Sequence, residues 1–556
     1  MSLFINIQEG EDQLPEVTSD KGRLLWISSV DHKQLGIMYL WLALFFFIIG
    51  GLEGGLEAML IRAQLAVGDN DLISPEFYNQ LFTMHGTTMI FLVLMPALIG
   101  LATYLIPLMI GANEMAFPRL NAFSFWMTCL GGFLMYFSFF AGGAPDAGWF
   151  NYAPLSESNY SSTQGVDYYL VGLILTGMGS IGAGLNFVTT ILTLRSPDIK
   201  LNMLPLFAWM IFINGFLILA AFPLLNAGLF MMLIDRQFDA HFFIPSSGGS
   251  AILWQHFFWS FGHPEVYILA LPAFGIISEV IPVFSRNKIF GYKFVAASTV
   301  AIALLAFGVW VHHMFAVGMT NTVNGFFAAS SMLIGIPTGV KVINWIGTLY
   351  KGSIRMTVSM MFAVAFLIDF TIGGLSGASF AIVPIDWQLT DTYYVVAHIH
   401  YVFLGGTAFG IFAGIYYWFP KISGRFLSEK LGKWHLWLFV IGFNFTFLVQ
   451  HVLGILGMPR RIYTYPSRFG SWEIFNMIST LGAVMMFVAI AVFLWNLFIT
   501  LKKPRTAPKN PWEAWTLEWA TNSPPDLKNF EEVPRVHSRR PLWDLANPDN
   551  PDKRLN

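Results

Sequence analysis

Twelve long apolar runs constrain this chain more than any other feature of its sequence. Each run has about 20 residues or more, the length that a helix needs to cross roughly 30 Å of hydrocarbon. The hydrophobic fraction of 55%, the charged fraction of 12% and the mean hydropathy of +0.59 fit lipid rather than water. The sequence therefore predicts an all-α membrane protein. Its twelve transmembrane helices are expected near 35–60, 80–108, 122–143, 167–194, 204–233, 251–284, 294–312, 323–349, 356–384, 392–418, 434–456 and 474–500.

The basic residues between these runs predict the orientation of the chain. The connections after even-numbered runs hold twelve Lys and Arg, and the other connections hold five. Cytoplasmic loops retain positive charge, so both termini are predicted to be cytoplasmic. We expect three parts: a polar N-terminal arm at 1–34, a twelve-helix core at 35–501, and a polar, Pro-rich C-terminal tail at 502–556 that straps or docks onto the core.

Composition excludes several kinds of function. The 31 basic and 33 acidic residues leave a net charge of −2 and no basic stripe, so a nucleic-acid partner is not expected. The single cysteine, Cys129, excludes an internal disulfide, a C-x-x-C-H haem attachment and a thiolate metal cluster. If the chain handles electrons, other side chains must hold its metals.

Histidines within the apolar runs are the candidate metal ligands. A lone intramembrane histidine is more often a packing residue or a proton relay. Several together favour metal binding, because neutral imidazole suits iron or copper in an apolar interior. The candidate ligands are six histidines that lie inside the runs or at their ends: His85, His263, His312, His313, His398 and His400.

The spacing of these histidines indicates more than one metal. His398 and His400 project roughly 200° apart on a helix, so they cannot share a metal. A helix with two such ligands suits a wall between two cofactors that each have iron at the centre. His312 and His313 differ by about 100°, and together with a third histidine, for which His263 is the candidate, they can converge on one copper.

Two ionisable residues within the runs favour proton transfer. Tyr267 lies one turn from His263 on the same predicted face, whereas Glu265 points to nearly the opposite face. A carboxyl among apolar side chains holds a proton that it can transfer, although Glu265 can also be a protonated structural residue. Lys341, with Thr338 one turn before it, gives a polar stripe that can carry protons. The alternative for Lys341 is a side chain that snorkels to the surface.

Together these residues resemble subunit I of the haem–copper oxidases, specifically of the aa3-type cytochrome c oxidases. The resemblance extends to about residue 525. It rests on seven segments: 85–88, 115–119, 259–267, 310–314, 337–341, 391–398 and 457–461.

The resemblance implies the cofactors and their ligands. Haem a would have the axial ligands His85 and His400, and haem a3 would be bound by His398. Copper B would be held by His263, His312 and His313, with Tyr267 covalently joined to His263. The pair Arg460 and Arg461 would meet the haem propionates, which would account for a basic cluster on the side that should have few cations.

The resemblance also implies the reaction and the partners. The family reduces O2 to water at the haem a3–copper B centre with electrons from cytochrome c, and it couples this reaction to proton uptake and pumping. Paired cysteines are absent, so the dinuclear copper would be carried by a separate subunit II. The other expected partners are subunit III, cytochrome c or a cytochrome c domain, and membrane lipid. The expected location is a bacterial plasma membrane.

Two proton routes and a magnesium site carry over by resemblance. The first route would comprise Lys341, Thr338, Ser278 and Tyr267. The second would run past Asn121 and Asn186 to Glu265, with Glu114 in place of the usual entrance aspartate and Thr103 in place of a usual asparagine. Asp391 is the candidate magnesium ligand, although Thr390 replaces a histidine that is typical of that site. Glu279 and Asp369 are further acidic residues within the runs that have no predicted role.

Three alternatives remain. A quinol oxidase would use the same metals, but its characteristic Arg, Asp and His correspond here to Glu53, Glu57 and Phe77. Nitric oxide reductases lack the Tyr267 equivalent and the lysine route. A proton-coupled transporter with twelve spans belongs to a different class of protein and would be colourless. The arrangement of the six histidines argues against it.

Overall fold

The computed structural model describes residues 26–52, 54–549 and 551–552, and it confirms the all-helical membrane fold. Eleven helical segments of the described chain are long and apolar enough to cross a membrane. The first predicted span corresponds to a further apolar helix, α2 (His32–Leu52), and its continuation α3 (Gly54–Gln64). In the described residues, β-pairing is limited to one bridge between Thr392 and Pro459.

The first half of the bundle packs mainly as neighbours in sequence. α6 packs on α7, α7 on α8 and α8 on α9, while α2 packs against α5. The helices after α3 are α4 (Pro75–Thr87), η2 (Thr88–Leu94), α5 (Met95–Ile110), α6 (Pro118–Phe137), η3 (Ser138–Phe140), α7 (Gly165–Thr193), η4 (Leu201–Met203), α8 (Leu206–Phe238), η5 (Pro245–Ser247) and α9 (Ala251–Ser285).

The second half brings together helices that are more distant in sequence. α13 packs on α16, α15 on α17, and α17 on α18 along most of their length. The helices are α10 (Tyr292–Ala306), η6 (Trp310–Val317), α11 (Asn321–Leu333), α12 (Gly335–Leu349), α13 (Val358–Phe380), α14 (Val383–Leu389), α15 (Tyr393–Val402), η7 (Phe403–Ala408), α16 (Phe409–Ser423), α17 (Glu429–Ile455), α18 (Gly470–Leu501), η8 (Leu517–Ala520) and α19 (Pro541–Ala546).

The α17–α18 contact shows how the membrane bundle achieves close packing. A Cβ on Gly442 would lie 2.6 Å from the Gly482 carbonyl oxygen, and a Cβ on Gly482 would lie 2.5 Å from the Gly442 carbonyl oxygen. Lipid tails are as apolar as the helices, so association in a membrane depends on such close backbone approach. A larger residue at either position would force the two helices apart.

Irregular helical turns accompany the candidate histidines. A π-helical segment, η2, begins three residues after His85, and another, η7, begins three residues after His400. The tighter 3₁₀ segment η6 carries His312 and His313 and is kinked at Met314. Such departures from the α-helix are common at functional sites, because they redirect the side chains of neighbouring turns.

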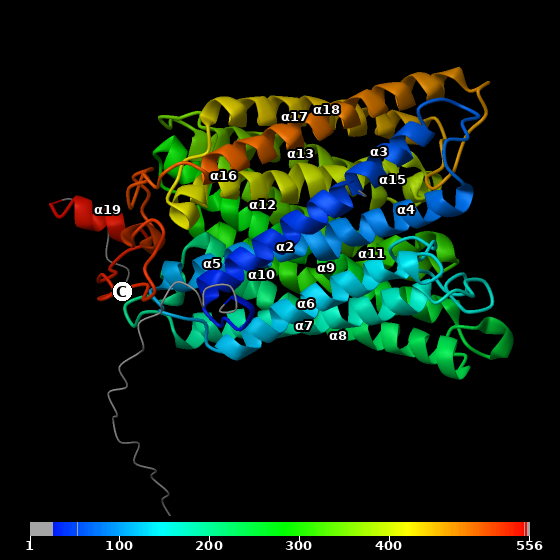
Figure 1. The fold of residues 1–556 in the computed structure, drawn as a ribbon, viewed down its shortest axis with the longest axis horizontal. Helices are drawn as coiled ribbons and strands as arrows, with labels where there is room; N and C mark the ends of the chain where they lie inside the picture. The colour runs from blue at the N-terminus through cyan, green and yellow to red at the C-terminus, as the bar shows by residue number, and fades with distance from the viewer. Residues whose placement is uncertain (1–25, 53, 550, 553–556) are drawn as a thin grey trace, which may run out of the picture.

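The C-terminal tail lies across one end of the bundle (Figure 1, orange to red). It is held there by side chains rather than by regular structure. The Trp512 indole donates to the Tyr417 carbonyl oxygen at 2.8 Å, and Lys421 Nζ donates to the Thr521 carbonyl oxygen at 2.7 Å. The division into arm, core and tail stays a prediction, as does the side of the membrane on which the termini lie. Residues 1–25 of the arm are outside the described residues.

Candidate metal centres and proton routes

Three histidines from two elements converge in the interior. His263 comes from α9, and His312 and His313 come from η6. One ring nitrogen of each lies within 4.8 Å of the others, and His263 Nδ1 is 3.0 Å from His312 Nε2. Among the described residues, this is the one group of three or more His, Cys, Asp or Glu side chains that can hold a metal ion. Three neutral imidazoles suit copper.

Neighbouring side chains orient two of these three rings. His312 Nδ1 lies 2.8 Å from the Ser331 hydroxyl, which leaves its Nε2 facing the cluster. The His313 ring stacks on Trp259 with 4.0 Å between the ring centroids and 11° between the planes. Supporting contacts of this kind fix the tautomer and direction of a metal ligand. The sequence analysis missed Ser331, which carries no signal until η6 and α11 are placed side by side.

Tyr267 and Glu265 lie close to this cluster along α9. The Tyr267 ring centroid is 4.9 Å from that of His263, as their one-turn spacing predicts, and its hydroxyl is hydrogen-bonded to Thr338. Glu265 is 1% exposed, and neither of its carboxyl oxygens has a hydrogen-bond partner among the described residues. A buried carboxylate without partners is costly, so this position suits a group that carries a proton.

His85 and His400 face each other across a gap that suits one metal atom. Their ring centroids are 6.4 Å apart, and their planes differ by 13°. With metal–nitrogen bonds of about 2 Å on each side, two axial imidazoles have centroids roughly 6 Å apart. The pair is therefore already spaced as two axial ligands of one iron.

Backbone carbonyl oxygens fix which ring nitrogen of His398 and His400 is free to bind a metal. His400 Nδ1 is 2.7 Å from the Val396 carbonyl oxygen, and His398 Nδ1 is 3.0 Å from the Gly373 carbonyl oxygen. A carbonyl oxygen only accepts, so Nδ1 carries the hydrogen in both rings and Nε2 keeps its lone pair for a metal. The Ser376 hydroxyl adds a second contact to His398 Nδ1 at 3.0 Å.

A glycine leaves room beside His398. A Cβ on Gly377 of α13 would lie 2.8 Å from His398 Cε1 and 3.6 Å from its Nε2. Any side chain at this position would push the ring or fill the space next to its free nitrogen. The glycine therefore allows α13 to pack closely against the His398 ring.

The two arginines lie in the loop after α17, at the end of the bundle away from the tail (Figure 1). Arg460 donates to Asp391 at 3.0 Å, whereas the Arg461 guanidinium lies 4.0 Å above the Phe150 ring. Burial and the neighbouring Arg460 lower the pKa of Arg461 to about 9. Among the described residues Arg461 forms no salt bridge, so a cofactor carboxylate would complete its surroundings. Asp391 itself is largely exposed.

Lys341 is enclosed in the protein. Its side chain is 0% exposed, and Nζ donates to the Val295 carbonyl oxygen at 3.0 Å and to Thr299 Oγ1 at 2.6 Å. The snorkelling alternative is therefore wrong, since the amine does not reach the surface. The sequence analysis missed Thr299, although Val295 and Thr299 share one face of α10.

The other residues of the lysine route are also hydrogen-bonded within the bundle. Ser278 accepts from the Trp345 indole at 2.9 Å and donates to the Phe274 carbonyl oxygen at 2.7 Å. Thr338 donates to the Ile334 carbonyl oxygen at 3.1 Å. Thr338 also contacts the Tyr267 hydroxyl.

Glu114 lies in the connection between α5 and α6. Its carboxylate accepts from the backbone N–H of Met115 at 2.9 Å and of His32 at 3.1 Å. Burial raises the pKa of Glu114 to about 7, with Asp31 adding to the rise and Lys33 opposing it. A carboxyl with this pKa can take up and release protons near neutral pH.

The two asparagines of the second route are buried near the start of α6. The Asn186 amide bonds both ways with Phe117, accepting from its N–H at 2.9 Å and donating to its carbonyl oxygen at 3.1 Å. Asn121 is 1% exposed, and its Nδ2 has no partner among the described residues. Thr103 Oγ1 is likewise without a partner. Such unpaired polar atoms are the kind of group that binds buried water, as the second route would require.

The two carboxyls without a predicted role both have structural partners. Glu279 accepts from the Phe207 N–H at 3.1 Å and so satisfies a free donor in the first turn of α8. Asp369 accepts from Asn444 at 3.3 Å, and Asn444 in turn accepts from the Tyr401 hydroxyl at 2.6 Å. Both carboxyls therefore stabilise helix contacts.

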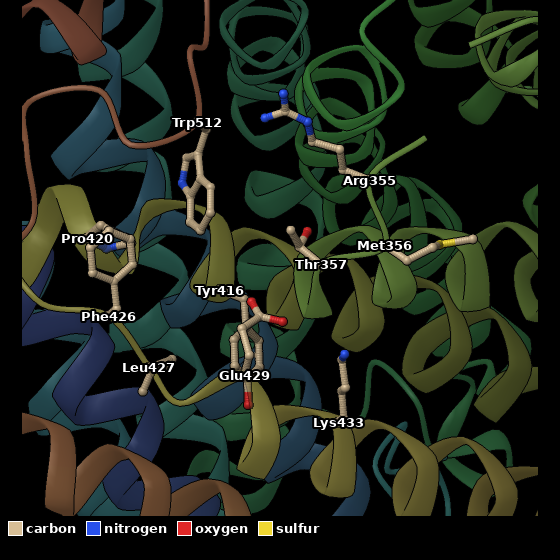
Figure 2. Close-up of a pocket in the computed structure, with 10 residues that line it drawn as sticks. All are labelled: Arg355, Met356, Thr357, Tyr416, Pro420, Phe426, Leu427, Glu429, Lys433 and Trp512. Atoms are coloured by element: carbon tan, nitrogen blue, oxygen red, sulfur yellow. The ribbon is translucent and has the colours of Figure 1, made fainter. Parts of the chain in front are cut away.

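A separate cavity of about 550 Å³ opens at the end of the bundle near the tail (Figure 2). Trp512 of the tail and Tyr416 of α16 line it, together with Arg355, Glu429 and Lys433. Glu429 also accepts from the Val358 N–H at 3.1 Å, at the start of α13. None of the predicted site residues lines this cavity.

Comparisons with known proteins agree with this geometry. The family model described as "Cytochrome C and Quinol oxidase polypeptide I" matches residues 34–485. Cytochrome c oxidase subunit 1 of Bacillus subtilis is 47% identical over 94% of this chain and 83% of its own length. Quinol oxidase subunit 1 of the same organism is 45% identical over 92% and 79%. A solved haem–copper terminal oxidase dimer has a similar fold, with a TM-score of 0.72 at 19% identity, covering 85% of this chain and 84% of that one.

Proposed function

The chain belongs to the cytochrome c and quinol oxidase polypeptide I family, and we propose that it is the oxygen-reducing subunit of a cytochrome c oxidase. It is a multi-pass protein of a bacterial plasma membrane and an oxidoreductase of the respiratory chain. The observation that carries the proposal is the meeting of six histidines within the helical bundle in three arrangements. One is a facing pair, one is a trio, and one is a single ring beside a glycine.

The residues fit the haems and copper of the family. His85 and His400 would hold haem a, as the 6.4 Å between their ring centroids allows, and His398, whose Nε2 is free, would hold haem a3. His263, His312 and His313 would hold copper B. When bound, the two haems and the copper supply the electron-transfer and oxygen-reducing chemistry.

Several side chains of this chain support that chemistry. Tyr267 lies against His263, whose Nε2 has no hydrogen-bond partner among the described residues, and it is the candidate for a covalent link there. Arg460 and Arg461 would hold the haem propionates as charged, planar donors. Trp259 stacks on the His313 ring and restricts its orientation.

Protons reach the site by two routes in this proposal. Lys341 receives protons and passes them through Thr338 to Tyr267, and Ser278 lies on the same route. Glu114 is the entrance of the second route, which continues past Asn121 and Asn186 to Glu265. Neither carboxyl oxygen of Glu265 has a hydrogen-bond partner among the described residues, so Glu265 holds its proton at rest, and a water on the route would accept it.

Cytochrome c is the favoured donor over a membrane quinol. Two positions of the typical quinol site are described here. Glu57 is buried, whereas Phe77 is partly exposed and cannot bind a quinol hydroxyl. The third, Glu53, lies outside the described residues. We propose that a subunit II with dinuclear copper delivers the electrons, and that a subunit III completes the complex. Asp391 stays a candidate magnesium ligand.

Optical spectroscopy and metal analysis of the purified complex test the proposal. We expect two haem A molecules and one copper bound by this chain, and a reduced-minus-oxidised spectrum with an absorption band near the red end of the visible range. His400→Ala should remove the low-spin signal, and His313→Ala should lower the copper content while both haems stay bound. A colourless complex that still moves protons would instead support the transporter alternative.

A further inference from the structure

The C-terminal tail meets the proposed proton entrance through one buried side chain, Asn529. This residue is 5% exposed, although it lies in a segment with little regular structure. Its Nδ2 donates to His32 Nε2 at 2.9 Å and to the Ala112 carbonyl oxygen at 2.9 Å. Its Oδ1 accepts from Lys33 Nζ at 2.9 Å. Both ends of the amide are therefore used inside the protein.

These contacts fix the state of His32. His32 Nδ1 is 3.0 Å from the Thr103 carbonyl oxygen, which can only accept, so Nδ1 carries the hydrogen. Nε2 then accepts from Asn529, as a neutral imidazole does. The backbone N–H of His32 donates to Glu114 at 3.1 Å. Asn529 thus orients the residue that binds the Glu114 carboxylate.

The tail also holds the nearest cation. Lys33 Nζ donates to Asn529 Oδ1 and to the Leu527 carbonyl oxygen at 3.0 Å, and it pairs with Asp31 at 3.2 Å. An ammonium has three hydrogens, so two of its three acceptors belong to the tail. Asp31 is fixed in turn, since it accepts from the N–H of Lys33 at 2.9 Å at the start of α2.

We propose that the tail is a working part of the proton entrance, with Asn529 as the positioning residue that holds His32 and Lys33 beside Glu114. This inference rests on the proposed role of Glu114 as the entrance. It follows that the tail does more than strap the bundle, because its hydrogen bonds set the charges around the first proton acceptor.

The pH dependence of turnover distinguishes this role from a structural one. The charged groups that act on Glu114 are Asp31, which raises its pKa, and Lys33, which lowers it. Asn529→Leu keeps a similar side-chain size but removes one of the three acceptors of Lys33 Nζ and so loosens its hold beside Glu114. The pKa of Glu114 should then rise, and the alkaline limb of the pH–turnover profile should move up by roughly one pH unit.

Two further variants keep the test informative. Asn529→Asp preserves the shape of the side chain and the acceptor for Lys33, but it replaces the donor to His32 with a negative charge. Because this charge raises the pKa of Glu114, the alkaline limb of the pH–turnover profile should again move to higher pH. The matched control is Asn510→Leu, which removes hydrogen bonds between Asn510 and Ala514 elsewhere in the tail. It should leave the profile unshifted.

The purified oxidase complex should be assayed from pH 6 to pH 10 with Glu114→Gln in parallel. If Glu114→Gln leaves proton uptake unchanged, the proposed entrance is wrong. If Glu114→Gln impairs uptake but both Asn529 variants lose only rate, with an unshifted profile, the inference about the tail is wrong while the entrance stands. A shift in both Asn529 variants supports the inference.

Discussion

Replacing Lys341 with methionine should stop turnover and leave the metals bound. The lysine is fully buried, and its Nζ donates to the Val295 carbonyl oxygen and to Thr299 Oγ1 on α10. Methionine fills similar space but cannot carry a proton. A positioned proton-transfer group contributes about 10²–10⁴-fold to a rate. We therefore expect less than about 1% of the parent turnover, a rise of at least roughly 2.7 kcal/mol in the barrier.

Oxygen consumption and the optical spectrum of the purified variant are the two measurements. The hydrogen bonds of Lys341 go to α10 and to none of the candidate ligands, so haem absorption and copper content should match the parent. Lys421→Met is the matched control, because Lys421 is equally buried but bonds to the tail through Thr521. It should keep most of the turnover. Substantial oxygen consumption by Lys341→Met with both haems present would refute the lysine route.

Three further changes test other parts of the site. Glu265→Gln should abolish pumping and slow turnover, since the amide carries no transferable proton, and unchanged proton release by reconstituted vesicles would contradict this. Gly377→Ala should lower the content of high-spin haem, because the new Cβ would lie 2.8 Å from His398 Cε1. Gly374→Ala on the same helix meets nothing within 4 Å and should bind haem normally. Glu157→Gln should raise the thermal midpoint at pH 8 but not at pH 5. Burial raises the pKa of Glu157 to about 7, so the folded state loses stability as pH rises from about 4.5 to 7, by roughly 1–2 kcal/mol. An equal midpoint at pH 8 would show that this carboxyl is already solvated.

The helical bundle was predictable because bilayer thickness dictates the length of each apolar run. The predicted run at 167–194 corresponds to α7 (Gly165–Thr193), and the run at 251–284 corresponds to α9 (Ala251–Ser285). Breaks within the spans were not predictable. The π-helical turns after His85 and His400 and the 3₁₀ turn at His312 depend on packing against other helices, which no local pattern records.

The candidate ligands were predictable from spacing, whereas their supporting partners were not. The separation of His398 from His400 follows from helical geometry alone. Ser331 and Ser376 contact His312 and His398 from other helices, and serine is common in spans for many reasons. Only the fold brings each serine within hydrogen-bonding distance of its histidine.

Two carboxyls on α9 show why burial alone does not identify a functional acid. Glu265 and Glu279 are both in the apolar interior of one helix, and a single sequence treats them alike. Glu279 accepts from the Phe207 N–H at the start of α8, where a negative charge also meets the positive end of the helix dipole. Glu265 has no such partner among the described residues. A carboxyl that satisfies a helix end has a structural reason to be there, so of the two it is the unpartnered Glu265 that we propose for proton transfer.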